Sequence, residues 1–414
     1  MKSLDLLKNN NHARLIPSFK RPERKLLSTF MAILNCSPNF RGKFLKNFGF
    51  NSEKASQINS FMEPEFEHPN IPPGRPDGLI CCKRGNTHWS AFIEAKVNGN
   101  EVRSEQIQKY LDLAKFLEVP VVISISNEFN LSLDQLPYNI PSNKYRGREV
   151  YHCSWSYIEN QMSMFCDDDD VPEVEAIIIK EALLYFNDPL SGVSTFDQMP
   201  AAWPDFVTSS ATKIGFNNQT AGLADIIHGW HQERRDITLK LGKIIREPVK
   251  QLMPRKLLVC ENERVKFDRA KLADHYVLEG AFTLGKSKVT LEVTAYLQSC
   301  TFETKLKLLP PADKQAKACA SWLCKKINVE NSPVDQIEFE WSGNTKSINL
   351  PVDSFLKHPH EIICDNKLAP KLIYLKTEKQ DVRRFKSRKR FIEDLENQLM
   401  KMAEFSKQIG LLES

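Results

Sequence analysis

The chain has 414 residues, of which 41% are hydrophobic and 26% are charged, and its formal net charge is +5. This composition is that of an ordinary folded protein, and it excludes the disordered and membrane-embedded classes. The length indicates two or three domains, most simply two, and so small a net charge does not by itself argue for a nucleic-acid partner.

The N-terminal segment has no apolar run of the kind that precedes a signal-peptide cleavage site. No later segment approaches the roughly 20 apolar residues that are needed to cross a bilayer. The ten cysteines include no C-x2-C pair, which favours reduced thiols over disulfides. We therefore expect a cytoplasmic protein that makes no contact with a membrane.

The first predicted element is a helix over 23–34, where apolar residues recur at helical spacing after Pro22. Two short strand-like runs follow, at 79–82 and 90–97, and a Gly-Asn pair separates them. Alternating apolar residues on both sides of such a pair predict a β-hairpin.

An amphipathic helix is predicted over 104–118, directly after the hairpin, with Ser104 as its candidate N-cap. The β-branched run 121–126 is typical of a strand inside a sheet. Three further elements, a strand over 149–153 and helices over 154–163 and 172–186, complete a predicted N-terminal domain of residues 1–186.

The second half of the chain begins with residues 187–220, which are rich in proline, serine, threonine and asparagine, and we interpret them as a linker. A second domain of the α+β class is predicted over 221–382, opening with a long amphipathic helix over 222–245. Residues 383–414 are predicted to form a basic C-terminal helix. The strands expected in the second domain lie at 256–261, 277–283, 287–297, 301–308 and 336–341.

The register of the hairpin follows from its two-residue turn. If Gly85 and Asn86 form a type II′ loop, the numbers of paired residues sum to 171. Asp77 then lies opposite Glu94, with Cβ atoms about 5 Å apart, and Lys96 shares their face because side chains alternate along a strand. The opposite face carries small and apolar residues, so a slip by one residue would bury the acids and expose the apolar set.

Two facing carboxylates destabilise a sheet unless a cation lies near them. Lys96 is one candidate for this cation. Mg²⁺ is another, because this hard ion is held by one or two carboxylates together with water and phosphate oxygens. Such an ion polarises a phosphoryl oxygen and lowers the pKa of a bound water, while an ammonium group offsets charge that develops in the transition state. The pattern therefore indicates phosphodiester hydrolysis.

These residues resemble the motif of the PD-(D/E)xK nuclease superfamily, which includes many restriction endonucleases and RecB-like nucleases. Pro76-Asp77 is similar to the PD element, and Glu94-Ala95-Lys96 is similar to the ExK element. The resemblance covers about residues 20–165 of this chain. It implies an α/β fold with a restriction endonuclease-like αβββαβ core, in which the segment near 63–68 is the first strand.

The resemblance also implies roles for individual residues. Asp77 and Glu94 would bind Mg²⁺ or Mn²⁺, and Lys96 would position or activate water. On the helix after the hairpin, Gln106 and Tyr110 resemble the QxxxY element of the RecB-like branch, which implies that Gln106 helps to orient the site. A third metal-binding carboxylate would come from Glu23 on the first helix.

The function implied by the resemblance is metal-dependent hydrolysis of DNA, with a role in defence against foreign DNA, and RNA is the alternative substrate. A second hypothesis is a nuclease fold with altered catalysis that acts as a nucleic-acid- or protein-binding scaffold. Each residue also has a structural interpretation: Asp77 follows a proline in a turn, Glu23 is favoured by the helix dipole, and Tyr110 is a core residue.

Basic residues are concentrated near the C-terminus. Between Lys371 and Arg390 the sequence has nine basic and two acidic residues. This run could contact phosphates, or it could be the solvated start of a helix. The side chains predicted to bind substrate are Tyr110, Arg383, Arg384, Lys386 and Arg388. The helix that follows would dock or form a homodimer, for which the second domain is the other candidate contact.

His228 and His231 lie three residues apart on the predicted helix 222–245, a spacing that can bind a metal, and Asp225 lies three residues further upstream. No fourth ligand is evident. Because Arg234 and Arg235 follow, we expect this segment to form a solvated or phosphate-facing surface.

Overall fold

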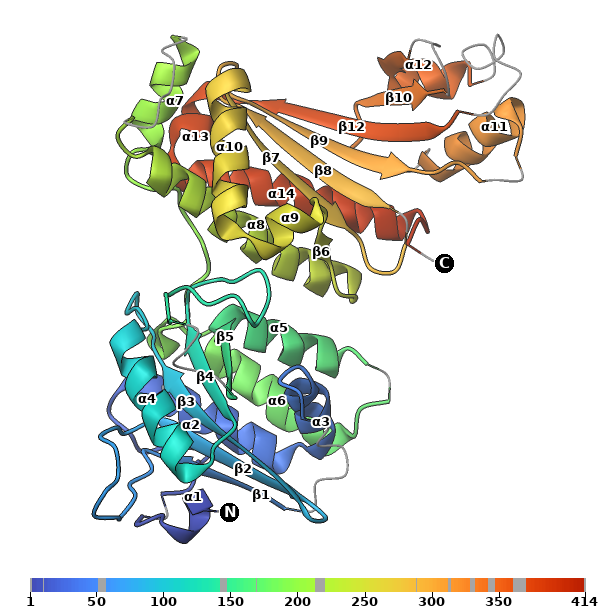
Figure 1. Cartoon of the computed structure of the whole chain (residues 1–414). Helices are drawn as coiled ribbons and strands as arrows, with labels where there is room; N and C mark the ends of the chain where they lie inside the picture. The colour runs from blue at the N-terminus through green and yellow to red at the C-terminus, as the bar shows by residue number, and fades with distance from the viewer. Residues whose placement is uncertain are drawn as a thin grey trace. The chain divides into compact units, whose positions relative to one another are not determined.

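The computed structural model describes residues 2–9, 11–50, 57–141, 147–168, 170–212, 220–287, 289–311, 314–327, 332–341, 347–359 and 370–412. It shows a mixed α/β protein that divides into two compact units, residues 1–195 and 196–414 (Figure 1). Each unit contains one β-sheet and its own hydrophobic core. Among the described residues, no helix has both the length and the apolar character needed to cross a bilayer.

The first unit is built on a five-stranded sheet in the order β1-β2-β3-β4-β5. The strands are β1 (Gln57–Met62), β2 (Gly78–Arg84), β3 (Thr87–Ala95), β4 (Val121–Ser126) and β5 (Glu149–Ser154). β2 is antiparallel to both of its neighbours, β1 and β3, whereas β4 runs parallel to both β3 and β5. The carboxyl ends of β3, β4 and β5 therefore meet at one edge, where α/β sheets usually bind ligands.

Helices cover both faces of this sheet (Figure 1). One face packs against α4 (Ser104–Leu117), whose apolar side includes Ile107 and Leu111. The helices on the other face are α2 (Pro22–Cys36), α3 (Pro38–Lys46), α5 (Trp155–Cys166) and α6 (Glu173–Phe186). Two short elements, α1 (Lys2–Asp5) and the 3-10 helix η1 (Pro189–Ser191), complete the unit.

The predicted order of helix, hairpin, helix and strand is confirmed, and so are the strand and the two helices that follow. Two details are wrong. The first strand of the sheet is β1 at 57–62 rather than 63–68; it pairs with β2, and its Phe61 also forms an isolated bridge with His12. Ser104 is not an N-cap, because Arg103 occupies that position and its side chain makes no capping hydrogen bond.

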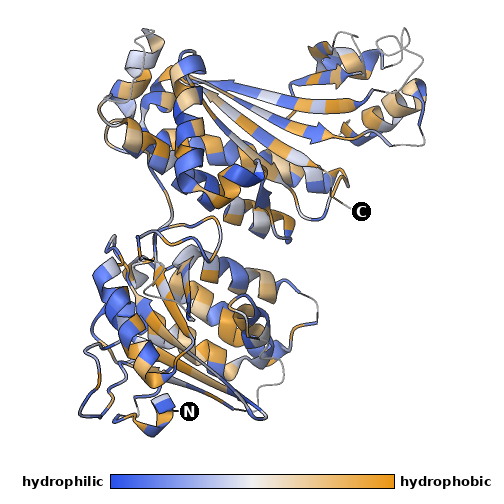
Figure 2. Cartoon of the chain, viewed as in Figure 1, coloured by the Kyte–Doolittle hydropathy of each residue, from blue (hydrophilic) through white to orange (hydrophobic). Residues whose placement is uncertain are grey.

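The second unit contains a seven-stranded antiparallel sheet in the order β11-β10-β12-β9-β8-β7-β6. Its strands are β6 (Lys250–Gln251), β7 (Val277–Thr283), β8 (Thr290–Tyr296), β9 (Thr301–Leu308), β10 (Gln336–Glu340), β11 (Ile348–Pro351) and β12 (Leu372–Gln380). Buried residues alternate with more exposed ones along β8 and β9, and Figure 2 shows the same alternation in hydropathy. Such a pattern is typical of a sheet with one face on the core.

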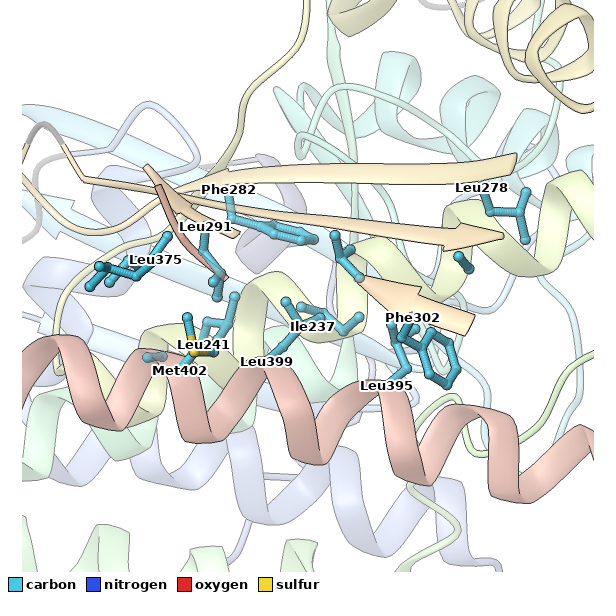
Figure 3. Close-up of a cluster of buried hydrophobic side chains, with 14 of the residues drawn as sticks. Ile237, Leu241, Leu278, Phe282, Leu291, Phe302, Leu375, Leu395, Leu399 and Met402 are labelled. Carbon is cyan, nitrogen blue, oxygen red and sulfur yellow. The ribbon is translucent and has the colours of Figure 1, made fainter. Parts of the chain in front are cut away.

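Two long helices, α8 (Leu223–Ile245) and α14 (Arg388–Gln408), pack against this sheet. Figure 3 shows Ile237 and Leu241 of α8 gathered with Leu395, Leu399 and Met402 of α14 beneath the strands. The remaining helices are α7 (Trp203–Ala211), α9 (Arg255–Val259), α10 (Glu261–His275), α11 (Ala316–Ile327), α12 (Val352–Lys357) and α13 (Val382–Lys386).

Three predictions for the second half are wrong. The segment 256–261 is not a strand, because its first four residues belong to α9 and its last residue, after the non-helical Cys260, begins α10. The interval 187–220 is not a simple linker, since α7 lies within it and Trp203 is buried in the second core; its residues 213–219 lie outside the described residues. Residues 383–414 are not a separate part, because α13 and α14 belong to the same core.

The C-terminal helix docks within its own unit. Leu395, Leu399 and Met402 are each 0% exposed, so this apolar face is not available for the homodimer that was one predicted use of the helix. The cysteines among the described residues are all free thiols, as expected.

Candidate active site

The hairpin that carries the predicted acids has the expected register. β2 and β3 pair from Arg84 opposite Thr87 to Gly78 opposite Ile93, so the paired numbers sum to 171. Gly85, the first residue of the turn, has a φ of +56°, which a type II′ turn requires at that position. The register is therefore confirmed up to the residue that follows Asp77.

Asp77 lies just ahead of β2, beside the carboxyl end of β3. Its Oδ2 accepts a hydrogen bond from the backbone N–H of Ala95 at 2.9 Å. Its carbonyl oxygen accepts another from the N–H of Glu63 at 2.8 Å. Glu63 is itself buried and forms an ion pair with Arg24 at 2.5 Å. These contacts hold Asp77 at the end of the strand that carries Glu94.

Glu94 is the centre of a hydrogen-bonded network and is 0% exposed. Its Oε1 is bound by Nζ of Lys96, and its Oε2 accepts a hydrogen bond from the Tyr110 hydroxyl at 2.8 Å. Gln106 Nε2 donates to the same hydroxyl at 2.8 Å. Four of the predicted site residues, from the end of β3 and from α4, therefore form one connected group.

The face of the hairpin that carries the acids is buried, contrary to the sequence prediction of one buried side. α4 covers this face, and Leu79 and Phe92 pack there in a cluster with residues of α4. Glu94 lies in the layer between the sheet and the helix. The side chain of Lys96 keeps 20% exposure, so the network reaches the surface at that end.

Burial and, to a smaller extent, the nearby Asp77 carboxylate raise the pKa of Glu94 to about 7, although Lys96 and Tyr110 act in the opposite direction. Burial also works to lower the pKa of Lys96, but the carboxylates of Glu94, Asp77 and Glu23 outweigh it and leave that pKa above its usual value. The three carboxylates of Glu94, Asp77 and Glu23 thus outnumber the single ammonium group of Lys96. A cation bound near Asp77 would favour the ionised form of Glu94.

A polar cavity of about 570 Å³ adjoins the network. Lys96 and Gln106 line it, together with Glu23 at the start of α2 and Arg103 just before α4. The Glu23 side chain is 23% exposed. The cavity is roomy enough for several water molecules or for a phosphate group, and its wall combines carboxylates with cations.

Glu23, Asp77 and Glu94 do not form a compact site of three carboxylates. Within the parts of the chain that the structure describes, one group of three acids has oxygens all within 4.8 Å of one another, and it belongs to the second unit. Asp77 and Glu94 still fit a divalent ion, since Mg²⁺ is often held by one or two carboxylates with water completing its shell. Glu23 contributes to the cavity wall and to the field at Lys96.

Two buried polar residues, Ser124 and His152, continue the site across the sheet and were not predicted. Ser124 of β4 pairs with Glu94 on one side and with His152 of β5 on the other, so the three side chains share a face. The Ser124 hydroxyl lies 2.8 Å from His152 Nδ1 and 2.6 Å from the Tyr138 hydroxyl. The signal in the sequence was a polar residue inside each of the runs VVISIS and EVYHCS.

The basic residues predicted to bind substrate lie in the second unit, where two of them have structural contacts. Arg384 binds the Asp394 carboxylate through Nε and Nη2, at 2.7 and 2.8 Å. Arg388 Nε donates to the carbonyl oxygen of Met199 at 2.6 Å. These two side chains hold α13 and α14 in place, which weakens the case for them as phosphate ligands.

The rest of the basic run is more accessible. Arg383 is exposed and Lys386 is half-buried. Phe385, which the sequence made a candidate for base stacking, is 1% exposed and packs in the core. The run therefore begins a helix whose aromatic residue points inward, with Arg383 left at the surface.

The segment with His228 and His231 does not form the solvated surface that was predicted. His231 is buried, and its Nε2 lies 2.6 Å from Oδ2 of Asp268. Arg234 Nη2 binds the same oxygen at 2.7 Å, and Arg235 is buried as well. Burial lowers the pKa of His231 to about 4 despite the opposing effect of Asp268. His228, in contrast, is exposed.

No protein-family model matches this chain, and no curated protein or solved structure matches it significantly. Its function is therefore inferred from the chemistry and the geometry of the site.

Proposed function

We propose that the protein is a metal-dependent nuclease that hydrolyses phosphodiester bonds in DNA. The observation that carries this proposal is the network of Glu94, Lys96 and Gln106 beside Asp77 at the carboxyl end of β3. Burying a carboxylate costs free energy that an apolar residue at the same place would not. A chemical role for Glu94 accounts for that cost.

The order of elements in the first unit supports the proposal. α2, β1, β2, β3, α4 and β4 occur in the αβββαβ order of a restriction endonuclease-like core, with the additional helix α3 between α2 and β1. The antiparallel hairpin brings Asp77 to the strand end that carries Glu94. Order and motif together are the grounds on which we infer a relation to PD-(D/E)xK nucleases.

The residues of the network suit distinct roles in such a reaction. Asp77 and Glu94 would hold Mg²⁺ or Mn²⁺, which when bound polarises a phosphoryl oxygen and lowers the pKa of water. Lys96 would offset the negative charge that develops on the phosphate. Gln106 fixes the Tyr110 hydroxyl, and that hydroxyl keeps Glu94 Oε2 in place.

The substrate class is inferred from charge and from the resemblance. Arg103 at the cavity and Arg383 in the second unit are exposed cations that suit contacts with backbone phosphates. Such contacts do not distinguish DNA from RNA, and DNA is preferred because the motif resembles that of deoxyribonucleases. Defence against foreign DNA is a role that fits this activity.

Cleavage of nucleic acid by the purified chain tests the proposal. Supercoiled DNA, linear DNA and single-stranded RNA are each incubated with Mg²⁺ or Mn²⁺. We expect Glu94→Ala to reduce cleavage at least about 100-fold, because it removes a metal-binding carboxylate and the partner of Lys96. The matched control is Glu105→Ala, which removes an exposed acid from α4 and should leave cleavage unchanged. Equal cleavage by the wild type and Glu94→Ala would contradict the proposal.

A second candidate function is favoured by one observation. Both oxygens of Glu94 already have partners within the chain, Lys96 and Tyr110, so the network is closed without a metal. The unit would then serve as a nucleic-acid- or protein-binding scaffold with altered catalysis. DNA binding that persists in EDTA and in Lys96→Ala, without cleavage in either metal, would favour this candidate.

A further inference from the structure

A second group of acids lies in the second unit. Glu233 and Asp236 are three residues apart on α8, and Glu396 comes from α14. One oxygen from each carboxyl group lies within 4.8 Å of the other two. The group is almost removed from bulk water, since Glu233 is 0% exposed, Asp236 is 1% exposed and the Glu396 side chain is 13% exposed.

Lys240 compensates part of the charge of this group. Its Nζ lies 2.9 Å from Oδ2 of Asp236 and 2.5 Å from Oε1 of Glu396. Asp236 Oδ2 also accepts a hydrogen bond from the backbone N–H of Phe196 at 3.1 Å. One ammonium group cannot neutralise three carboxylates, so a surplus of negative charge remains in a buried place.

Two more distant residues, one acidic and one basic, do not change the net charge of this group. Asp197 acts on Glu396 as a further negative charge, and Lys243 acts on Asp236 as a further positive one. With these two residues included, four acids face two ammonium groups. A buried excess of this kind is unfavourable unless protons or a bound cation offset it.

Glu233 is the residue that these contacts do not explain. Both of its carboxylate oxygens are buried, and neither has a hydrogen-bond partner among the residues that the structure describes. Burial, followed by the charges of Glu396 and Asp236, raises the pKa of Glu233 well above its ordinary value. Buried polar atoms without a partner are rare in proteins, and binding of an ion is one explanation for them.

We propose that Glu233, Asp236 and Glu396 bind a hard divalent cation, Mg²⁺, Ca²⁺ or Mn²⁺, between α8 and α14. The donor set consists entirely of carboxylate oxygens, which such ions prefer. Ca²⁺ binds oxygens at about 2.3 to 2.6 Å and Mg²⁺ at about 2.0 to 2.1 Å. Oxygens that all lie within 4.8 Å of one another therefore have to move somewhat closer together to share one such ion. Lys240 and Glu396, with side chains 22% and 13% exposed, mark the route by which the ion enters.

The ion would join two helices that build one core. Ile237 and Leu241 of α8 lie beside Leu395 and Leu399 of α14 in that core (Figure 3). In the sequence of the same two helices, Asp236 directly precedes Ile237 and Glu396 directly follows Leu395. We therefore expect the ion to have a structural role. Its ligands are not residues of the proposed nuclease site, and its loss should affect stability and not cleavage chemistry. Binding of the ion should change the stability of the second unit.

Binding of Mn²⁺ to the full chain, measured by electron paramagnetic resonance after EDTA treatment and dialysis, tests this proposal. Asp77→Asn/Glu94→Gln serves as the background, because it removes the carboxylates of the proposed nuclease site. We expect this background to bind about one Mn²⁺ per chain, which excess Ca²⁺ or Mg²⁺ displaces. Adding Glu233→Gln should abolish binding, whereas Glu404→Gln, an exposed position on α14, should retain it.

Thermal unfolding gives a second readout. Mn²⁺ should raise the unfolding midpoint of the background variant by several degrees and should have no effect once Glu396→Gln is added. The partly exposed Glu396 also provides the test if Glu233→Gln does not fold. No Mn²⁺ binding by the background, or binding that survives both glutamine substitutions, would overturn the proposal and would leave a shared proton as the reason for the burial of Glu233. Because the background lacks Asp77 and Glu94, the outcome does not depend on whether the first unit is a nuclease.

Discussion

The Glu94 carboxylate is buried, which disfavours its ionised form, yet both of its oxygens have hydrogen-bonding partners. α4 removes its carboxylate from water, and Asp77 places a second acid nearby, so its pKa is about 7 even though Lys96 and Tyr110 bind both of its oxygens. Near neutral pH, a proton and a metal ion would therefore compete for the same group.

This shift makes the stability of the metal-free first unit depend on pH. The pKa of Glu94 is about 7 in the folded chain against an ordinary value of 4.5, so the folded state binds the proton more tightly than the unfolded state does. The contribution of Glu94 to the free energy of unfolding is then fully present below pH 4.5. It should fall by roughly 3 kcal/mol as the pH rises through 7.

Urea unfolding in EDTA at a series of pH values measures this contribution. Glu94→Gln has the same shape but does not ionise, so the difference between wild type and variant isolates Glu94 from the other titrating groups. We expect the wild type to lose stability relative to Glu94→Gln between pH 4.5 and 7. Parallel curves for the two proteins would show that Glu94 is not buried as an acid.

A site residue could be predicted from the sequence when its partners lie close to it in the chain, and could not be predicted when they lie far away. Asp77, Glu94 and Lys96 could be placed together because a two-residue turn sets the pairing of the strands that carry them. Glu233 and His231 could not be placed, since their surroundings come from α14 and from Asp268 on another helix. Local pattern contains no information about such contacts.

At the scale of elements, the hairpin depends on the close approach of α2 to β2. A Cβ atom added to Gly78 would lie 2.7 Å from Sδ of Met31, which is 0% exposed and has little freedom to move. Glycine is therefore needed at the first position of β2, directly after Asp77. The same contact ties the first helix to the strand that begins the candidate active site.

Gly78→Val should destabilise the first unit by about 2 kcal/mol, because it overpacks a tightly filled part of the core. Gly74→Ala is the matched control, since its added Cβ would find its nearest neighbours at 3.4 Å, an ordinary contact, and should change stability by less than about 0.5 kcal/mol. Chemical denaturation followed by circular dichroism measures both. Equal stability of the two variants would mean that Met31 yields more easily than its burial indicates.

The elements that were predicted correctly have patterns that are complete within a few residues, such as the apolar run of β4 and the helical spacing of α4. The run KLLVCE at 256–261 was predicted as a strand, but its first four residues lie in α9. Short apolar runs have no clear period by which a helix and a strand can be told apart. Helix α10 had no counterpart among the predicted elements. Its buried residues include Arg264 and Asp268, polar side chains whose burial depends on partners elsewhere in the fold.

At the scale of the whole molecule, the two units have separate cores. No residue belongs to more than one of the three hydrophobic clusters, and two clusters lie in the first unit while one lies in the second. Chains divided in this way often unfold domain by domain. The chemistry of the first unit and the proposed ion of the second should therefore be separable in experiments on the intact chain.

Calorimetry of the full chain should resolve two unfolding transitions. Gly78→Val should lower the midpoint of one transition, and Leu399→Ala, which removes a 0% exposed side chain from the second core, should lower the other by the equivalent of about 2 to 5 kcal/mol. Each substitution should leave the other transition in place. A single transition that both substitutions shift together would show that the units unfold as one.

The position of α14 has a consequence for how the protein is made. This helix supplies Leu395, Leu399 and Met402 to a core that begins with Met199 and Trp203, about 200 residues earlier. During translation, the apolar face of the sheet in the second unit cannot be fully buried until α14 has left the ribosome. The first unit has all of its core residues much sooner. If translation stopped before α14 was made, the product would contain a complete first unit joined to an incomplete second unit, whose sheet would expose apolar side chains and favour aggregation.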